Sequence, residues 1–334
     1  MSDSDLAGAR PTLKTISKLT GLAIATVSRA LHDAPDIGAE TKRRVHEVAD
    51  QIGYRPNRAG VRLRTGKTNV ISLVLSTDHD VMNHTARLIS SVAGALRGTP
   101  YHLIVTPYFP SEDPMEPVKY IVETQSADAI ILNQTQPNDP RVAWLMEKGF
   151  PFATHGRTNW CDSHPYFDFD NARFAELGVE RLGARGRKHI LMLAPRMDQN
   201  YAKDMVNGAQ SMGRKLGVHV EILKSVSSDD GSIAAEAAVR EALAADPTID
   251  GVITASTTTC MSACAAAEDL GRVVGQDIDL FSKEAIPFLK RFRRDIQCVQ
   301  EDVATAGAFL ARAALKRISD PMALPMQGLD SPKL

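Results

Sequence analysis

The chain has 334 residues, of which 43% are hydrophobic and 24% charged, and its 39 Lys and Arg nearly balance its 40 Asp and Glu. This composition is typical of a globular protein of two to three domains. No apolar run approaches the ~18 residues of a membrane span, the first ten residues lack the apolar stretch of a secretory signal, and the four cysteines form no Cys-x-x-Cys pair, which favours a reducing compartment. We therefore expect a cytoplasmic protein without a membrane partner.

Charge is distributed unevenly along the chain. Residues 1–68 carry 12 Lys and Arg against 7 Asp and Glu, whereas residues 69–334 carry 27 against 33. A basic segment attached to an acidic remainder is expected when only that segment must contact a polyanion such as DNA. A fluctuation of solvated surface charge would produce the same counts, so the asymmetry alone does not decide the question.

The first 68 residues have the pattern of a helix-turn-helix unit. Apolar residues recur at helical spacing from Leu13, after the candidate N-cap Thr12, and Gly21 ends the run. The same spacing predicts two further helices near residues 23–31 and 39–52. Two short helices joined around one glycine, with a third packed behind them, form a helix-turn-helix arrangement.

From residue 69 onward, short apolar runs alternate with helical stretches. Strands are expected at 70–75, 101–105, 129–132, 150–153, 190–193, 219–223 and 251–254, with helices between them, for example at 85–96, 172–182, 206–216, 232–243 and 261–270. Buried strands alternating with helices predict parallel sheets in an α/β fold. We expect two doubly wound lobes, followed by a loose tail over residues 320–334.

The sequence lacks the motifs of catalysis and of cofactor binding. It has no Gly-x-Gly-x-x-Gly, no Gly-x-x-x-x-Gly-Lys-Ser/Thr, no Gly-x-Ser-x-Gly and no Cys/His spacing typical of a metal site. Cys260 and Cys264 could share a helix face, but the alanines around them favour buried packing. We therefore expect no enzymatic activity, no cofactor and no metal ion.

The amino-terminal residues resemble the signature of the LacI/GalR (lactose repressor) family. Residues 12–22, 25–31, 40–45 and 52–57 carry the resemblance, and shorter segments at 126–132, 170–171, 186–190 and 299–303 keep the family's order. The resemblance implies an all-α helix-turn-helix headpiece and an α/β two-lobed body like that of periplasmic binding proteins. It also implies a transcriptional repressor that binds a palindromic double-stranded operator as a homodimer and is controlled by a small-molecule effector.

The resemblance also divides the chain into parts. Residues 1–10 are expected to be disordered, residues 11–64 to form the headpiece with a hinge helix at about 57–64, and residues 65–68 to be a linker. The body, residues 69–334, would place about 69–167 plus 297–325 in one lobe and 168–296 in the other. The chain would cross between lobes near 166–170, near 295–297 and at the last strand or helix.

The second headpiece helix is expected in the major groove, with its N-terminal residues at the base edges. Ala23, Ile24 and Ala25 would offer apolar contacts, and Arg29 carries a guanidinium that fits guanine, with a phosphate contact as the alternative. Further contacts that position the headpiece on the DNA are expected from Thr26, Ser28, Thr41 and Tyr54.

In the family, the hinge helix folds on operator DNA and inserts a leucine into the minor groove. The resemblance gives these roles to Asn57, Gly60 and Leu63. An apolar wedge unstacks one base step, and the resulting bend permits further contacts. Gly60 stands where the family usually has alanine, and glycine disfavours a helix by about 1 kcal/mol. We expect tight coupling between DNA binding and hinge folding; a plain flexible linker is the alternative.

The effector is expected in the cleft between the lobes, beyond the carboxyl ends of the strands. The candidate effector-binding residues are Met82, Asn83, Asn133, Arg157, Tyr201, Lys203, Met205, Ser256, Glu284 and Glu301. Amide and guanidinium groups among them suit vicinal hydroxyls. The family usually has arginine where this chain has Met205, so a neutral hexose in the family's usual pose is disfavoured. A derivatised sugar, a polyol or an amino-sugar-derived compound near Glu284 and Glu301 is expected instead, as inducer or as corepressor.

A second class of protein could use the same body. A solute-binding receptor without DNA function needs no basic headpiece and normally requires export. The basic amino-terminal segment and the lack of a secretory signal pattern both count against this alternative. A gel shift on a palindrome from the gene's own upstream region would distinguish a DNA-binding regulator from a solute-binding receptor.

Overall fold

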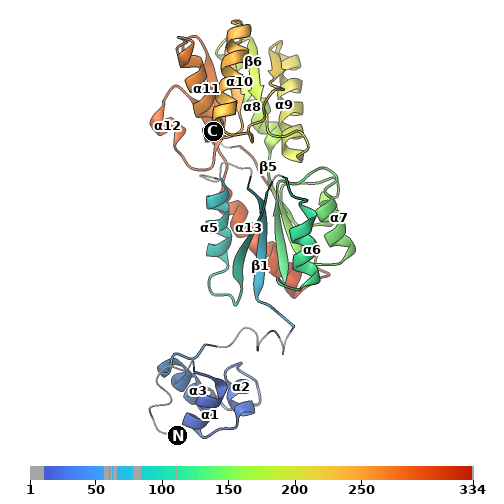
Figure 1. Cartoon of the computed structure of the whole chain (residues 1–334), viewed down its shortest axis with the longest axis vertical. Coiled ribbons are helices and arrows are strands. Elements are labelled where there is room, and N and C mark those ends of the chain that lie inside the picture. Colours follow the sequence, from blue (N-terminus) through green and yellow to red (C-terminus); the bar gives the residue numbers. More distant parts are fainter. Residues whose placement is uncertain are drawn as a thin grey trace. The chain divides into compact units, whose positions relative to one another are not determined.

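The computed structural model describes residues 11–55, 60, 62, 66–77, 84–109 and 111–332. It divides into two compact units, Met1–Thr68 and Asn69–Leu334, which are the headpiece and the body and are drawn in one frame in Figure 1. Each unit is described by itself. No helix within the described ranges is both long and apolar enough to cross a bilayer.

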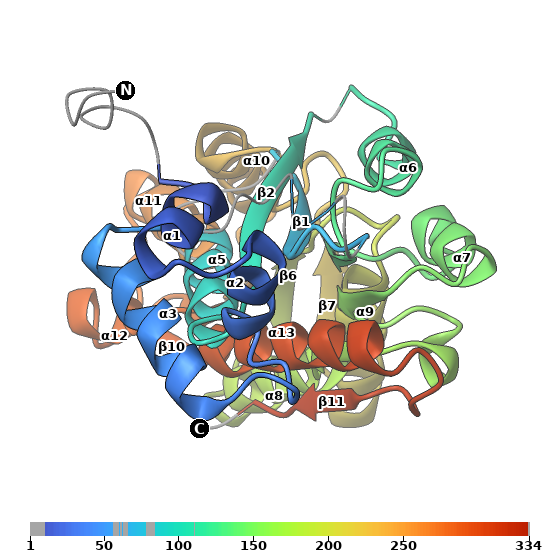
Figure 2. The same cartoon turned by 90° about the horizontal axis from the view of Figure 1, so that it is seen from below.

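Residues 11–55 of the headpiece form a bundle of three helices, α1 (Leu13–Thr20), α2 (Ile24–Ala30) and α3 (Ala39–Gln51), drawn in blue in Figure 2. Thr12 caps α1, because its side chain accepts from the Thr15 N–H while the Thr15 hydroxyl accepts from the Thr12 N–H. Gly21 follows with φ of 70°, a conformation that glycine adopts without steric cost, and it turns the chain into α2. The core of the bundle consists of Ile16, Val27, Ala30, Val45 and Ala49.

The first lobe of the body is built on a six-stranded parallel sheet in the order β11-β5-β4-β3-β1-β2. Its strands are β1 (Val70–Ser76), β2 (His102–Tyr108), β3 (Ala129–Asn133), β4 (Phe152–His155), β5 (Tyr166–Phe169) and β11 (Gln327–Asp330). Helices α5 (His84–Ala95) and α13 (Val303–Ser319) cover one face, and α6 (Met115–Glu123) and α7 (Pro140–Glu147) cover the other. Because both faces are covered, β1 is buried along almost its whole length and reads as a continuous apolar run.

The second lobe repeats this architecture with a five-stranded parallel sheet in the order β10-β9-β8-β6-β7. Its strands are β6 (His189–Leu193), β7 (His219–Ile222), β8 (Gly251–Thr254), β9 (Asp279–Glu284) and β10 (Gln297–Gln300). Helices α8 (Asn171–Ala184) and α9 (Asn200–Leu216) pack on one face, α10 (Ser232–Ala245) and α11 (Thr257–Asp269) on the other, and the short α12 (Leu289–Phe292) precedes β10. The predicted fold class is therefore confirmed for both parts of the chain.

The carboxyl-terminal third differs from the prediction in two places. β10 pairs with β9 in the second lobe, so the prediction that residues 297–300 belong to the first lobe is wrong. The tail is not loose over residues 320–334, because β11 pairs with β5 as an edge strand of the first sheet. Within the described ranges the chain passes between the lobes at 169–171 and 300–303. It makes no third crossing up to residue 330, because α13 packs in the first lobe and β11 pairs with β5 there.

Candidate functional site

Helix α2 presents its amino-terminal face to solvent. Ala23 is its N-cap, and Ala23, Ile24, Ala25 and Arg29 are all exposed, while Val27 and Ala30 are buried in the headpiece core. Ile24 is 47% exposed, which is high for an isoleucine whose burial would stabilise the fold. The helix therefore exposes the four side chains that the sequence predicted for the base edges.

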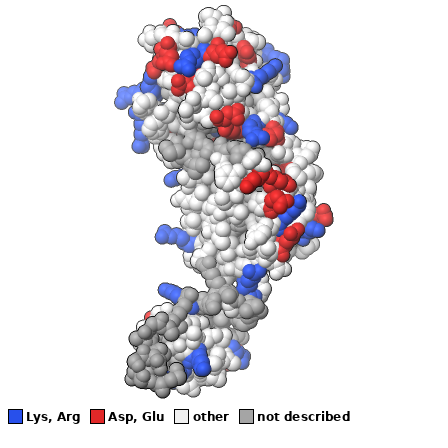
Figure 3. Space-filling view, viewed as in Figure 1, with Lys and Arg blue, Asp and Glu red and all other residues white. Residues whose placement is uncertain are grey.

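The Arg29 guanidinium forms an ion pair with the Asp36 carboxylate in the loop before α3. Both side chains are about half exposed, so this pair is worth at most about 1 kcal/mol and holds the guanidinium only weakly. In Figure 3 the charged side chains visible on the described surface of the headpiece are mainly Lys and Arg, whereas the body shows both signs of charge. The headpiece surface can accordingly approach a polyanion.

The other predicted DNA-contacting residues are less exposed. Thr26, Ser28 and Thr41 are partly exposed on α2 and α3, and Tyr54 packs against the headpiece core, where burial raises its pKa. Gly60 is helical, and a Cβ built on it would meet no atom within 4 Å. Asn57 and Leu63 lie outside the described residues, so their predicted hinge roles stay predictions.

A pocket lies between the two lobes of the body, at the carboxyl ends of the strands. Its volume is about 1000 Å³ when the space open to solvent is included. The first lobe contributes residues at the start of α5 and at the ends of β3, β4 and β5. The second lobe contributes residues that end β9 or follow β7, β8 and β10, together with the first residues of α8 and α9. Its polar lining residues include Asn133, His155, Asp168, Asn171, Ser228, Ser256, Thr257, Lys283, Glu284 and Glu301.

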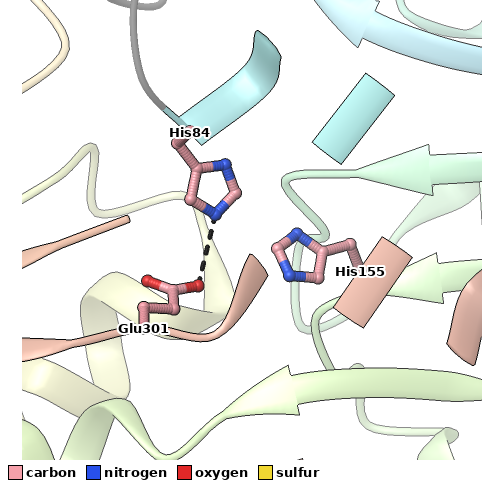
Figure 4. Close-up of side chains that lie close together, drawn as sticks. All are labelled: His84, His155 and Glu301. Carbon is pink, nitrogen blue, oxygen red and sulfur yellow. Dashed lines mark hydrogen bonds and ion pairs between the residues drawn. The ribbon is translucent and has the colours of Figure 1, made fainter. Parts of the chain in front are cut away.

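The centre of the pocket is a buried network of paired charges. The Lys283 ammonium lies 2.9 Å from one Glu301 carboxylate oxygen, and His84 Nε2 lies 3.2 Å from the other. Figure 4 shows His84 and Glu301 joined in this way, with His155 beside them; the two imidazole rings are 5.2 Å apart. Asn171 holds Lys283 from the other side, since its amide oxygen accepts from Nζ at 2.8 Å. Two buried side chains of opposite charge thus neutralise each other inside the cleft.

Burial and neighbouring charges set the protonation states in this network. Burial opposes ionisation of Glu301, but the charges of Lys283 and His84 outweigh it and hold its pKa well below the usual range. Burial, with the nearby charge of His84, lowers the pKa of His155 to about 3. Burial also raises the pKa of Asp168 to about 6, against the opposing effect of the Arg157 guanidinium. At neutral pH, Glu301 is a carboxylate and His155 a neutral imidazole.

Aromatic rings surround the Lys283 ammonium. Its nitrogen lies 5.1 Å from the ring centre of Phe169, 5.6 Å from that of Tyr201 and 5.9 Å from that of Phe174. A cation over the face of an aromatic ring is attracted by the ring quadrupole. This environment, together with Glu301 and Asn171, holds the lysine side chain in place. The cluster of His84, His155 and Glu301 has the donor set of a metal site, but Lys283 already supplies its positive charge.

Five of the ten predicted effector-binding residues line this pocket. These are Asn133, Tyr201, Ser256, Glu284 and Glu301. Met82 and Asn83 lie outside the described residues. Of the others, Met205 is fully buried in the second-lobe core and Lys203 is exposed on α9, so neither lies in the pocket.

Arg157 also lies outside the pocket lining and links the lobes instead. Its Nε donates to Asp168 of β5 at 2.7 Å, and its Nη2 donates to Asp204 of α9 at 3.1 Å. Because β5 belongs to the first lobe and α9 to the second, the guanidinium bridges the two. In this structure Arg157 thus forms a contact between the lobes and does not line the pocket that was expected to hold the effector.

Several pocket residues were not predicted from the sequence, namely His84, His155, Asp168, Asn171 and Lys283. A signal was present for some of them: Asp168 and Asn171 flank the predicted first crossing between lobes, where a cleft residue is expected. Lys283 gave no such signal. A lysine next to a glutamate in a sequence usually indicates a solvent-exposed position. Here, however, both residues belong to β9, which is buried along its whole length.

Comparisons with known proteins agree with this architecture. Residues 12–57 match the family described as "Bacterial regulatory proteins, lacI family", and residues 121–318 match "Periplasmic binding protein domain". The HTH-type transcriptional regulator AglR of Rhizobium meliloti is 29% identical over 95% of this chain and 90% of its own length. The HTH-type transcriptional regulator RafR of Escherichia coli is 32% identical over 64% of each chain.

Two solved structures show the same fold over nearly the whole chain. One is a lac repressor dimer bound to operator and the anti-inducer ONPF, with a TM-score of 0.83 at 16% identity, covering 97% of each chain. The other is a complex of the transcriptional regulator CelR with cellobiose, with a TM-score of 0.71 at 22% identity, covering 97% of this chain and 98% of that one. The relatives are transcriptional regulators and not enzymes. With a lacI-type headpiece followed by a periplasmic-binding-protein body, the chain belongs to the LacI family of transcriptional regulators.

Proposed function

We propose that this regulator is a repressor that binds a palindromic operator as a homodimer and responds to a sugar in the inter-lobe pocket. The observation that carries the DNA part is the exposed amino-terminal face of α2, where Ile24, Ala25 and Arg29 reach solvent together. A single three-helix headpiece offers little contact area, so two copies reading two half-sites are expected. This role also places the protein in the cytoplasm.

Binding to a palindrome from the gene's own upstream region tests this proposal. Full-length protein should retard that DNA specifically, and the affinity should fall steeply with salt because phosphate contacts release counterions. Arg29→Ala should cost about 1–3 kcal/mol of operator binding if the guanidinium contacts a base. Arg240→Ala, which removes an exposed ion pair with Asp269 on the second lobe, is the matched control and should change nothing. Equal binding by Arg29→Ala and wild type would contradict the proposed readout.

The pocket favours a neutral, polyhydroxylated effector. Its acidic side chains already have partners: Glu301 lies beside Lys283 and His84, Asp168 lies beside Arg157, and Asp229 accepts from the backbone N–H of Arg196 at 3.1 Å. Glu284 accepts from the backbone N–H groups of Phe288 and Leu289 at 2.8 and 2.7 Å. An amine would therefore have to compete for an occupied carboxylate, which weakens the case for an amino sugar. Amide and hydroxyl side chains such as those of Asn133 and Ser256 line the pocket, and groups of this kind match the hydroxyls of a sugar.

Thermal unfolding against a panel of monosaccharides, disaccharides and amino sugars tests the effector proposal. A ligand that binds only the folded state raises the melting temperature; cellobiose belongs in the panel because a structural relative binds it. Asn133→Ala should abolish the shift, and Lys203→Ala, an exposed change outside the pocket on α9, should not. A shift with amino sugars alone would overturn the preference for a neutral ligand. Whether DNA binding rises or falls on ligand addition then assigns it as corepressor or inducer.

A further inference from the structure

A second cluster of ligand-type side chains lies on the second lobe, away from the pocket. His189 is the first residue of β6 and His219 is the first residue of β7, and the two are register partners in adjacent parallel strands. Glu221 follows His219 by two positions and therefore points to the same face of the edge strand. The pocket lies at the carboxyl ends of the second-lobe strands, whereas this cluster lies at the amino ends of β6 and β7. The cluster thus has no part in the proposed effector site.

The three side chains converge. One ligand atom from each of His189, His219 and Glu221 lies within 4.8 Å of the others, and the two imidazole rings are 4.5 Å apart. His189 is mostly buried, with 13% of its side chain exposed, while His219 and Glu221 are open to solvent. The site is therefore accessible from outside and anchored by one fixed ligand.

Hydrogen bonds assign the tautomer of His189. The Thr248 hydroxyl donates its one hydrogen to Asp246 Oδ1 at 2.6 Å, so its oxygen must accept from His189 Nδ1, 2.9 Å away. The other Asp246 oxygen lies 3.6 Å from the same nitrogen. With its hydrogen on Nδ1, the neutral imidazole has a lone pair on Nε2.

That lone pair faces a carboxylate. His189 Nε2 is buried and makes no hydrogen bond to any described residue, and Glu221 Oε2 lies 3.4 Å away. A lone pair opposite an anionic oxygen is unfavourable unless a cation lies between them. Thr248 and Asp246 thus hold Nδ1 of His189, while Nε2 faces the other two side chains. Histidines that bind zinc are oriented in the same way, by a hydrogen bond from the ring nitrogen that does not bind the metal.

We propose that His189, His219 and Glu221 bind a first-row transition-metal dication of the Zn²⁺ class. Two imidazoles and one carboxylate, with water completing the shell, form a known donor set for this ion. Asp246 and Thr248 are positioning residues that hold His189 for the metal. A bound ion joins the edge strand β7 to β6 and so stabilises the second lobe.

Calorimetric titration of Zn²⁺ into untagged, chelator-treated full-length protein near neutral pH tests the proposal. We expect one equivalent to bind with a dissociation constant of about 1–10 µM, and the melting temperature to rise. His219→Gln and Glu221→Gln should each abolish this binding, and Thr248→Val should weaken it about tenfold, as loss of an orienting partner does. His102→Gln is the matched control, because His102 is an exposed first residue of an edge strand in the other lobe.

Each other outcome overturns the proposal. No binding below about 100 µM would mean that a proton, and not a metal, lies between His189 and Glu221. Binding that survives His219→Gln but is lost in His155→Gln would place the ion in the pocket, at the cluster of Figure 4. Absorption of bound Co²⁺ in the His219→Gln and His155→Gln variants is an independent readout, because the variant that loses the visible bands identifies the cluster that holds the ion.

Discussion

At the scale of single residues, the Lys283–Glu301 pair has the largest predicted effect on stability. Both side chains are about nine-tenths buried, and their charged atoms lie 2.9 Å apart. Glu301→Gln leaves the ammonium buried without its counter-charge, which typically costs about 3–5 kcal/mol. We expect the free energy of unfolding in urea to fall by this amount at neutral pH. The double variant Lys283→Met with Glu301→Gln should recover much of the loss; additive losses would contradict a mutual interaction.

His155 should make the body sensitive to acid. Its pKa of about 3 in the folded state lies below the ordinary 6.5, so the unfolded chain binds a proton first as the pH falls. The stability contributed by the neutral side chain is complete above pH 6.5 and is lost as the pH drops towards 3. Between pH 7 and pH 5 the loss is about 2 kcal/mol.

Denaturant unfolding at several pH values measures this effect. The His155→Gln variant should lose less stability than wild type on going from pH 7 to pH 5. His102→Gln, which removes an exposed imidazole from β2, should retain the wild-type pH profile. Parallel profiles for wild type and His155→Gln would show that another group is responsible.

The sequence predicted only some residues of the candidate site. It found those whose place follows from a local strand pattern and missed those whose place depends on tertiary contacts. Asn133 and Ser256 follow apolar strand patterns, so their place at the carboxyl end of a sheet was predictable. Met205 and Lys203 were placed by position along the chain alone, and the turn of helix α9 directs one into the core and the other to solvent. Lys283 became recognisable only when its partners were known, because a buried charge depends on contacts from distant segments.

At the scale of elements, the α8–α9 contact requires a glycine. A Cβ on Gly208 of α9 would clash with the carbonyl oxygen of Ala172 in α8, and backbone cannot move aside as a flexible side chain can. Gly208→Ala should therefore destabilise the second lobe by about 1–3 kcal/mol, despite the better helix propensity of alanine. Gly94→Ala in α5 is the control: its Cβ meets nothing within 4 Å, so propensity alone should act and stabilise by up to about 1 kcal/mol. Melting temperatures that move in the same direction would contradict this account.

The same scale explains which elements the sequence predicted. β1, β3 and β8 are apolar and buried on both faces, and each was predicted close to its observed bounds. β9 was not predicted, although it is equally buried, because it ends in Ser282, Lys283 and Glu284. β11 is an edge strand with the sequence Gln-Gly-Leu-Asp, and its residues are alternately exposed and partly buried. It therefore lacks the run of apolar residues by which a buried strand is predicted. The polar residues that β9 supplies to the pocket, Lys283 and Glu284, thus concealed this strand.

At the scale of the whole molecule, the chain separates two kinds of recognition. The headpiece carries excess positive charge and an exposed helix face, whereas the body carries excess negative charge and a pocket of internally paired ions. We expect ligand binding in the body to influence the headpiece by changing how the lobes are arranged, since a ligand shifts an equilibrium by its differential affinity for the two states. The contacts between the lobes are therefore the place to test coupling.

The Arg157–Asp204 ion pair is the contact that we expect to limit opening of the cleft. Asp204→Asn removes one end of the bridge while Arg157 keeps Asp168, and for a partly exposed pair the loss is about 1 kcal/mol, or about fivefold in the open population. The Asn200 N–H reports opening directly, because it donates to the Thr135 carbonyl oxygen of the other lobe at 2.9 Å. Its hydrogen exchange should accelerate about fivefold in Asp204→Asn. Asp269→Asn removes a pair within the second lobe and should leave this amide unchanged; equal acceleration in both variants would mean that exchange reports unfolding of that lobe and not separation of the two.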